Sequence, residues 1–128
     1  MKYFCYLLLT WIIVACDGES SGRDANPFYL PPEGFAADTN KGAVLFRENC
    51  ASCHGRAGSG SNQGPPLVHK TYNSSHHADL SFHLAVKIGV RRHHWRVGDM
   101  PPLPSVSPEA VGHIVAYVRA LQHRAGIK

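Results

Sequence analysis

The sequence predicts an all-α fold, a small domain in which three main helices are joined by long loops. Three stretches carry helix signals, and segment 55–75 between the first two is rich in Gly, Pro and Ser. The chain of 128 residues has room for one small domain. About 91 residues form its folded part, which gives only a small hydrophobic core. A domain of this size gains stability from a large group bound in its interior.

The first two helices are predicted over residues 38–49 and roughly 78–88. Asp38 is a suitable N-cap for the first, because its carboxylate can accept hydrogen bonds from free backbone N–H groups. The apolar residues of this helix are Val44, Leu45 and Phe46. Gly89 stops the second helix. Leu80, Leu84 and Ile88 recur at helical spacing and therefore lie on one face of this second helix.

The last helix has the clearest boundaries. Ser107 is suited to the N-cap, Pro108 to the first helical position, and Glu109 to the first turn. Gly126 follows the predicted end of the helix. The residues expected on its buried face are Val111, Ile114, Val115, Val118 and Leu121.

Residues 1–15 are predicted to be a signal peptide. Lys2 supplies its positive start, and the apolar run 3–15 is well short of the ~20 residues that span a bilayer as a helix. Residues 13–16 (Ile-Val-Ala-Cys) resemble the lipobox of bacterial lipoproteins, in which the peptide is cleaved before a Cys that receives a diacylglycerol. This resemblance implies lipidation at Cys16 and a location on the outer, periplasmic or extracytoplasmic face of the bacterial cytoplasmic membrane. An ordinary secretory signal and an uncleaved anchor are the alternatives.

Cys16 and the segment up to residue 37 are expected to connect this anchor to a domain at 38–128. Residues 17–25 are polar and small, which is typical of a tether, whereas aromatic and apolar residues in the Pro-rich stretch 26–37 predict an extended segment partly packed on the domain.

Charge is distributed unevenly between these parts. Residues 17–37 carry a net charge of −3, and residues 38–128 carry eleven Lys and Arg against five Asp and Glu, a net of +6. A domain this basic suits a partner with an acidic docking face, or an anionic surface. The basic residues are scattered and no nucleic-acid-binding motif accompanies them, so nucleic acid is not an expected partner.

The residues Cys50-Ala51-Ser52-Cys53-His54 match the C-x-x-C-H signature of covalent haem attachment. Two thiols three residues apart at the end of a helix can each form a thioether with one vinyl group of a macrocycle, and His54 can then bind the iron. A structural zinc site usually needs a second ligand pair, and a thioredoxin-like site belongs in a βαβ context. A disulfide between Cys50 and Cys53 remains open, but it does not explain His54.

From Asp38 to Leu121 the chain resembles the class I cytochrome c family. In that family a Gly and an aromatic residue of the first helix meet the last helix at a close crossing, positions that Gly42 and Phe46 match here. Ile114 and Tyr117 fit the facing pair on the last helix. The resemblance implies a small cytochrome c fold around one covalently bound haem c. Ordinary core packing is equally compatible with these four residues.

The run Gly64-Pro65-Pro66-Leu67 resembles the family segment that lines the His side of the haem. The resemblance implies that the Pro65 carbonyl accepts the proton of His54 Nδ1, which fixes the ring and raises its basicity. It also implies that Leu67 packs on the haem face.

Met100 is the candidate second axial ligand. Apart from Met1 it is the only Met, and it lies in the Gly98-Asp99-Met100-Pro101-Pro102 stretch, which predicts an extended loop rather than a helix. The family places its ligand Met in a similar Met-Pro context before the last helix. His54 with Met100 is the pairing that raises haem potentials in cytochromes c.

Nine histidines are many for 128 residues. The pairs His76-His77 and His93-His94 lie near the edges of the middle helix. A bis-His haem, a second metal site and contacts to haem propionates are functional interpretations, and solvated surface histidines are the simpler one. By the family resemblance, Trp95 or Tyr72 could donate hydrogen bonds to propionates.

These features predict an electron carrier rather than an enzyme. With His54 and Met100 on the iron, no coordination position remains for a small-molecule substrate. The predicted function is therefore electron transfer through an exposed haem edge, steered to a redox partner by the basic surface. The alternatives are a gas- or peroxide-reactive haem protein, a sensor or peroxidase in which Met100 dissociates, and a haem subunit of a larger respiratory oxidoreductase.

Overall fold

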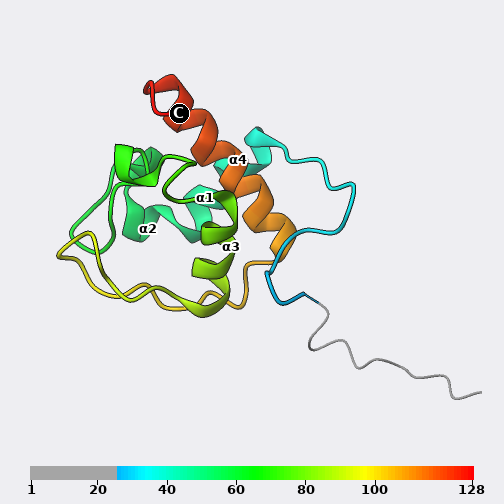
Figure 1. Cartoon of the computed structure of the whole chain (residues 1–128), viewed down its shortest axis with the longest axis horizontal. Coiled ribbons are helices and arrows are strands. Elements are labelled where there is room, and N and C mark those ends of the chain that lie inside the picture. Colours follow the sequence, from blue (N-terminus) through cyan, green and yellow to red (C-terminus); the bar gives the residue numbers. More distant parts are fainter. Residues whose placement is uncertain (1–25) are drawn as a thin grey trace, which may run out of the picture.

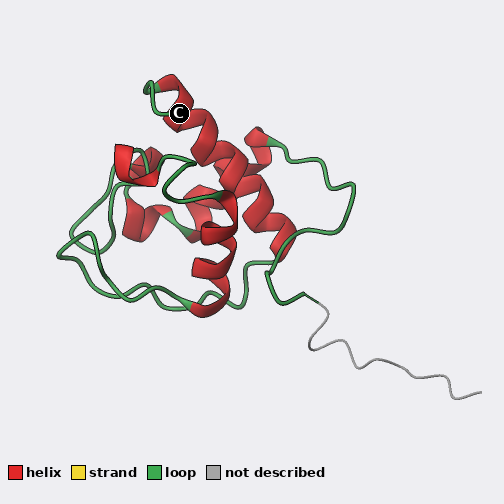
Figure 2. Ribbon diagram, in the orientation of Figure 1, coloured by secondary structure: helices red, strands yellow, loops and turns green. Residues whose placement is uncertain are grey.

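The structure, a computed structural model, describes residues 26–128 (Figure 1). The predicted signal peptide at 1–15 and the lipidation site Cys16 lie outside the described residues. The elements in chain order are α1 (Thr39–Asn49), α2 (Ala51–His54), the 3-10 turns η1 (Arg56–Gly58) and η2 (Lys70–Tyr72), α3 (Asp79–Ile88) and α4 (Pro108–Arg124). Within residues 26–128 the elements are all helical, and long loops fill the space between them (Figure 2). This confirms the predicted small all-α fold.

The first and last helices begin where their capping residues predict. The side chain of Asp38 accepts hydrogen bonds from the backbone N–H groups of Asn40 and Lys41, at 2.7 and 3.2 Å. The Ser107 hydroxyl accepts one from the N–H of Ala110 at 3.2 Å, and Pro108 occupies the first helical position. Each side chain satisfies N–H groups that have no partner within the helix.

The face of α3 that carries Leu80, Leu84 and Ile88 is not its buried face. Ile88 is 68% exposed, and the residues of α3 that are buried are His83 and Val86. The reason is the direction of tertiary packing, because α3 contacts α4 and the interior through the side that carries Phe82 and Val86. The helical spacing of Leu80, Leu84 and Ile88 therefore marks a stripe that lies largely outside this contact.

Helices α1 and α4 cross at very short range and make the most extensive helix–helix contact in the described residues. A Cβ atom added to Gly42 would lie 2.0 Å from the carbonyl oxygen of His113 and 2.9 Å from Tyr117 Cβ. One turn later Phe46, 1% exposed, places its ring 5.6 Å from the Tyr117 ring. Only Gly at position 42 allows this approach, and Phe46 fills the space beside it.

Segment 26–37 packs on α3 and α4, and in Figure 1 it runs along α4 on the side away from the green and yellow loops. The Tyr29 hydroxyl donates to the Val106 carbonyl at 2.7 Å, and His83 Nδ1 lies 2.7 Å from the Tyr29 carbonyl oxygen. Phe35 lies so close to α4 that a Cβ at Gly112 would be 2.7 Å from its ring. None of the helices within residues 26–128 has the length and apolar character needed to cross a bilayer.

Candidate haem site

The sequence-predicted haem contacts meet in one cleft. Those residues are Cys50, Cys53, His54, Pro65, Leu67 and Met100. The cleft holds about 1100 Å³ of empty space when its open mouth is included. Its walls come from the α1–α2 junction, the loop around residue 65, α3, α4 and the loop around Met100. Residues more than 40 positions apart in sequence are thus brought to one site.

The first wall of the cleft, here called the Cys50–Leu67 wall, is built around a buried histidine. His54 is the last residue of the one-turn helix α2 and is 8% exposed. Its Nδ1 lies 2.9 Å from the Pro65 carbonyl oxygen, the contact that the family resemblance implies. Because a carbonyl can only accept, Nδ1 carries the proton and Nε2 keeps a free lone pair. Burial also lowers the pKa of His54, against the effect of the Pro65 hydrogen bond, so the neutral, metal-binding form is favoured.

Glycine residues allow the two chain segments of this wall to approach each other closely. A Cβ at Gly64 would lie 2.7 Å from the Cys53 carbonyl oxygen, so no larger residue fits there without displacement. Gly55, directly after His54, has a φ of 75°, a left-handed conformation in which the chain turns back. The Pro65 carbonyl consequently reaches the His54 ring.

The two thiols of the wall are free and half-buried. Burial, with a smaller contribution from the nearby Cys53, raises the pKa of Cys50 to about 11. Redox-active C-x-x-C sites do the opposite, because they lower the pKa of the attacking thiol to form a thiolate. The raised pKa of Cys50 is therefore the opposite of what a thioredoxin-like exchange site requires.

The second wall, here called the Met100 loop (residues 89–103), is attached by its backbone to the end of α3. Val90 and Met100 exchange two backbone hydrogen bonds, each 2.9 Å long, in an isolated antiparallel bridge. Leu103 N–H donates to the Val86 carbonyl at 2.8 Å. Gly89 is required at the start, because its φ is 77° and a Cβ there would lie 2.5 Å from the Met100 carbonyl oxygen. These contacts hold Met100 at the cleft in an extended conformation.

The remaining lining of the cleft suits a large apolar ring system. Its buried apolar members are Leu67, Val86, Val111, Ile114 and Val115, with Phe82 half-buried beside them. Trp95 Nε1 lies in the same lining as a buried N–H without a partner among the described residues. Burial also raises the pKa of Tyr72, which keeps its hydroxyl protonated as a second donor. The residues present therefore fit a haem: two thiols, an imidazole and a thioether, apolar walls, and donors suited to carboxylates.

Several residues of the site are not apparent from the sequence. Phe82 and Val86 line the cleft from α3, and only their spacing of four residues could have suggested a shared face. Gln122, 2% exposed on α4, donates from Nε2 to the Leu67 carbonyl at 2.8 Å and to the Tyr72 carbonyl at 3.0 Å. A polar residue within the apolar face of the last helix was the available signal.

The fold and the site together define a small helical protein that holds haem covalently. The family model for cytochrome c matches residues 39–122, which covers α1 through most of α4. The chain belongs to the cytochrome c family, whose members bind haem c and transfer electrons between redox protein partners. No curated protein matches the chain significantly.

Proposed function

We propose that this protein is a membrane-tethered class I electron carrier that binds one haem through Cys50 and Cys53, with His54 and Met100 as axial ligands. The observation that carries the proposal is the convergence of these four side chains on one apolar cleft. His54 offers a neutral imidazole oriented by Pro65, and the Met100 loop offers the only thioether in residues 26–128. The haem supplies one-electron Fe(II)/Fe(III) chemistry, and the protein supplies its ligands and its surroundings.

Axial ligation by Met100 separates an electron carrier from a gas- or peroxide-reactive haem protein. A carrier keeps both axial positions filled by the protein, whereas a sensor or peroxidase must open one. The two backbone hydrogen bonds between Val90 and Met100 support the carrier, because they fix the Met100 backbone at the cleft. Electron transfer then proceeds through the open mouth of the cleft.

The test is spectroscopic. The purified protein should keep its haem after acid-acetone extraction, and the pyridine haemochrome should indicate two thioether bonds. The oxidised protein should be low-spin with the weak charge-transfer band of Met–iron ligation, and the reduced protein should bind carbon monoxide slowly. Extraction of all haem would overturn covalent attachment. Rapid carbon monoxide binding would favour the reactive haem protein.

The partner is proposed to dock an acidic face over the cleft mouth. Arg91, Arg92 and Arg96 are all exposed on the Met100 loop, and Arg92 also lines the cleft. Against these three cations the loop carries one acid, Asp99, whose carboxylate accepts from the Arg92 backbone N–H at 3.0 Å. Opposite charges near the electron-transfer edge accelerate encounter and orient the partner.

The membrane tether is proposed from the sequence of the N-terminal segment. Cleavage before Cys16 and acylation of its thiol would leave residues 17–25 between the lipid and the packed segment that starts at Asn26. Nine residues span at most about 30 Å, so the domain would remain close to the outer face of the cytoplasmic membrane.

Mass spectrometry of the mature protein tests this tether. It should find an acylated glyceryl group on an N-terminal Cys16, and Cys16→Ser should release the protein from membranes. Cys5→Ser is the matched control, because this cysteine lies within the predicted signal peptide and should be dispensable. A mature protein that starts elsewhere, without lipid, would instead support plain secretion.

A further inference from the structure

Three histidine side chains from two loops meet at the rim of the haem cleft. Ring nitrogens of His76, His77 and His94 all lie within 4.8 Å of one another, and His76 Nε2 is 3.2 Å from His94 Nε2. We propose that these three residues form a second metal site, for a late first-row divalent ion such as Cu²⁺ or Zn²⁺. None of the four proposed haem-binding residues belongs to this cluster, although His77 and His94 also line the cleft.

The spacing of one pair of nitrogens, those of His76 and His94, matches that of two ligands around one ion. Metal–nitrogen bonds of about 2.0–2.1 Å in a tetrahedral arrangement place two ligand nitrogens about 3.3 Å apart. The 3.2 Å between His76 and His94 is therefore the separation that a shared ion requires. An imidazole–imidazole hydrogen bond explains this pair equally well, but it leaves the third ring without a role.

The third residue, His77, has a feature of its own that points to a metal ligand. Its Nε2 is buried and has no hydrogen-bond partner among the described residues. The His77 ring stacks on Tyr72 with centroids 4.8 Å apart, and it lies 5.4 Å from the His94 ring. Burial lowers the pKa of His77, with the neighbouring histidines adding to the effect, so the ring is held in its neutral form. A neutral imidazole with an unused nitrogen is the form that binds metals.

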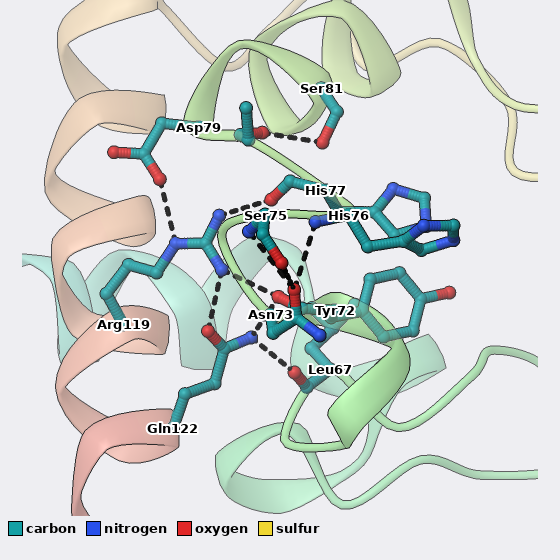
Figure 3. Close-up of polar contacts among 11 residues, drawn as sticks. Leu67, Tyr72, Asn73, Ser75, His76, His77, Asp79, Ser81, Arg119 and Gln122 are labelled. Atoms are coloured by element: carbon teal, nitrogen blue, oxygen red, sulfur yellow. Dashed lines mark hydrogen bonds and ion pairs between the residues drawn. The ribbon is translucent and has the colours of Figure 1, made fainter. Parts of the chain in front are cut away.

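The backbone beneath His76 and His77 is fixed by hydrogen bonds to Asn73 and Arg119 (Figure 3). The Asn73 carbonyl accepts from the N–H groups of both histidines, at 3.2 and 2.8 Å, and its side-chain oxygen accepts from His76 N–H at 3.0 Å. The Arg119 guanidinium donates to the carbonyl of His77 and to that of Tyr72. Figure 3 shows the two imidazole rings pointing away from this network.

Arg119 is itself anchored on both sides. It forms an ion pair of 2.7 Å with Asp79 and donates at 2.7 Å to the oxygen of the buried Gln122. This arrangement orients two ligands before any ion binds, as outer-shell hydrogen bonds do in natural metal sites. The nearby carboxylate of Asp79 is already engaged, which leaves nitrogen as the available donor type.

The donor set determines the class of ion. Imidazole nitrogens favour Cu²⁺, Zn²⁺ and Ni²⁺ over the oxygen-seeking Mg²⁺ and Ca²⁺, and among divalent ions Cu²⁺ binds most tightly. His93 lies next to the cluster, with its ring 4.3 Å from that of His94, but it is not among the three residues whose ring nitrogens lie within 4.8 Å of one another. We therefore assign three ligands and leave the remaining position to water.

An ion at this site would join two separate loops. His76 and His77 precede α3, whereas His94 belongs to the Met100 loop. Near this point the loops are otherwise joined by contacts of the His94 ring with the rings of His76 and His77. Metal binding should therefore restrict the Met100 loop, close to the mouth of the cleft.

Metal titration of the haem-loaded protein, first treated with a chelator, tests the site. Calorimetry with Zn²⁺ should give one ion per chain, and Cu²⁺ should show imidazole-nitrogen couplings in its EPR spectrum. His76→Asn and His94→Asn should each weaken Zn²⁺ binding at least tenfold. Both side chains are exposed, so neither change should unfold the protein. His123→Asn is the matched control on the exposed end of α4 and should bind as the unchanged protein does.

Two further measurements distinguish a specific three-histidine site from unspecific metal binding to the many histidines of this surface. His93→Asn should retain one ion per chain, with affinity within about threefold of the unchanged protein. Zn²⁺ should also slow hydrogen exchange in residues 73–78 and 91–99 together. Binding that survives both His76→Asn and His94→Asn, or that falls equally in His123→Asn, would overturn the proposal. Slower exchange in only one of the two loops would overturn the joining of the loops.

Discussion

The two walls of the cleft hold their proposed iron ligands, His54 and Met100, by different means. In the Cys50–Leu67 wall, His54 is 8% exposed and Gly64 packs so tightly that a Cβ would overlap the Cys53 backbone. In the Met100 loop the ligand is held mainly by backbone hydrogen bonds to Val90, and a Cβ at Gly98 would meet nothing within 4 Å. Packed side chains resist displacement collectively, whereas a loop held by a few hydrogen bonds can open locally. Met100 is therefore expected to be the more easily displaced of the two proposed ligands.

The largest expected effect is the difference in haem loading between a substitution of His54 and a substitution of Met100. His54→Ala removes the buried imidazole from the wall, and we expect little or no haem-loaded protein to accumulate. Met100→Ala should still give covalently loaded protein, because both thiols and His54 remain. Its potential should fall, since the thioether favours Fe(II), and its reduced form should bind carbon monoxide rapidly. Haem staining of denatured protein, redox titration and carbon monoxide kinetics measure these differences.

Met100→His refines this first comparison. It should keep the iron six-coordinate and low-spin while still lowering the potential, because a second imidazole replaces the thioether. If Met100→Ala leaves the spectrum of the oxidised protein unchanged, Met100 is not the ligand. One of the nearby histidines, such as His77, would then be the ligand to test by substitution.

A pair of glycine substitutions compares the packing of the two walls. Gly64→Ala places a methyl group 2.7 Å from the Cys53 carbonyl oxygen, and overpacking of this kind typically costs about 1–3 kcal/mol. Gly98→Ala enters open space and should change stability by no more than about 0.5 kcal/mol, as surface substitutions usually do. Denaturant unfolding of the haem-loaded proteins measures both. Equal losses would show that the two walls are packed alike.

The same contrast explains how much the sequence could predict. The Cys50–Leu67 wall is built from neighbours in the chain, so the C-x-x-C-H motif and the Gly64–Leu67 run indicate it locally. Met100 was recognisable for another reason, since it is the only Met in residues 2–128. Helix caps at Asp38 and Ser107 were likewise predictable, because a cap depends on side chains within a few residues.

Features that depend on distant segments were not predictable. Periodicity shows that Leu80, Leu84 and Ile88 share a face of α3, but it does not show which face is buried, and packing on α4 selects the side of Val86 and leaves Ile88 exposed. Likewise, the sequence shows two histidine pairs, yet only the fold brings His94 to within 3.2 Å of His76. The role of Gln122, which binds carbonyls 50 and 55 residues away, also arises only in three dimensions.

Charge reversal on the Met100 loop should affect the partner reaction more than stability. Arg96→Glu should slow electron transfer to an acidic partner several-fold at low ionic strength, because it replaces attraction with repulsion at the cleft mouth. Lys41→Glu makes the same charge change at an exposed position of α1 that does not line the cleft, and it should have a smaller effect. Stopped-flow kinetics across a salt series measures both, and the difference should vanish as salt screens the charges. Equal slowing by both variants would contradict docking over the Met100 loop.

The smallest expected effect is a pH dependence of stability that arises from His83 in α3, the helix to which the Met100 loop is attached. Burial lowers the pKa of His83, against the opposing effects of the Tyr29 carbonyl and Asp79. His83 lies on α3 one turn before Val86, whose carbonyl holds Leu103 of the loop. Below the unfolded-state pKa of about 6.5, the unfolded chain binds a proton that folded His83 does not. The free energy of unfolding should therefore fall as pH drops from 7 towards the lowered pKa, and this dependence should level off below it.

His83→Gln isolates this contribution, because glutamine keeps an N–H for the Tyr29 carbonyl but does not titrate. Its unfolding free energy should change less between pH 7 and pH 5 than that of the unchanged protein. His123→Gln, an exposed substitution at the end of α4, should leave the slope as it is. If α3 supports the Met100 loop, acid should weaken the Met–iron band before the covalent wall is disturbed, and His83→Gln should shift that loss to lower pH. A band that disappears at the same pH in both proteins would mean that acid acts on the loop directly, without α3.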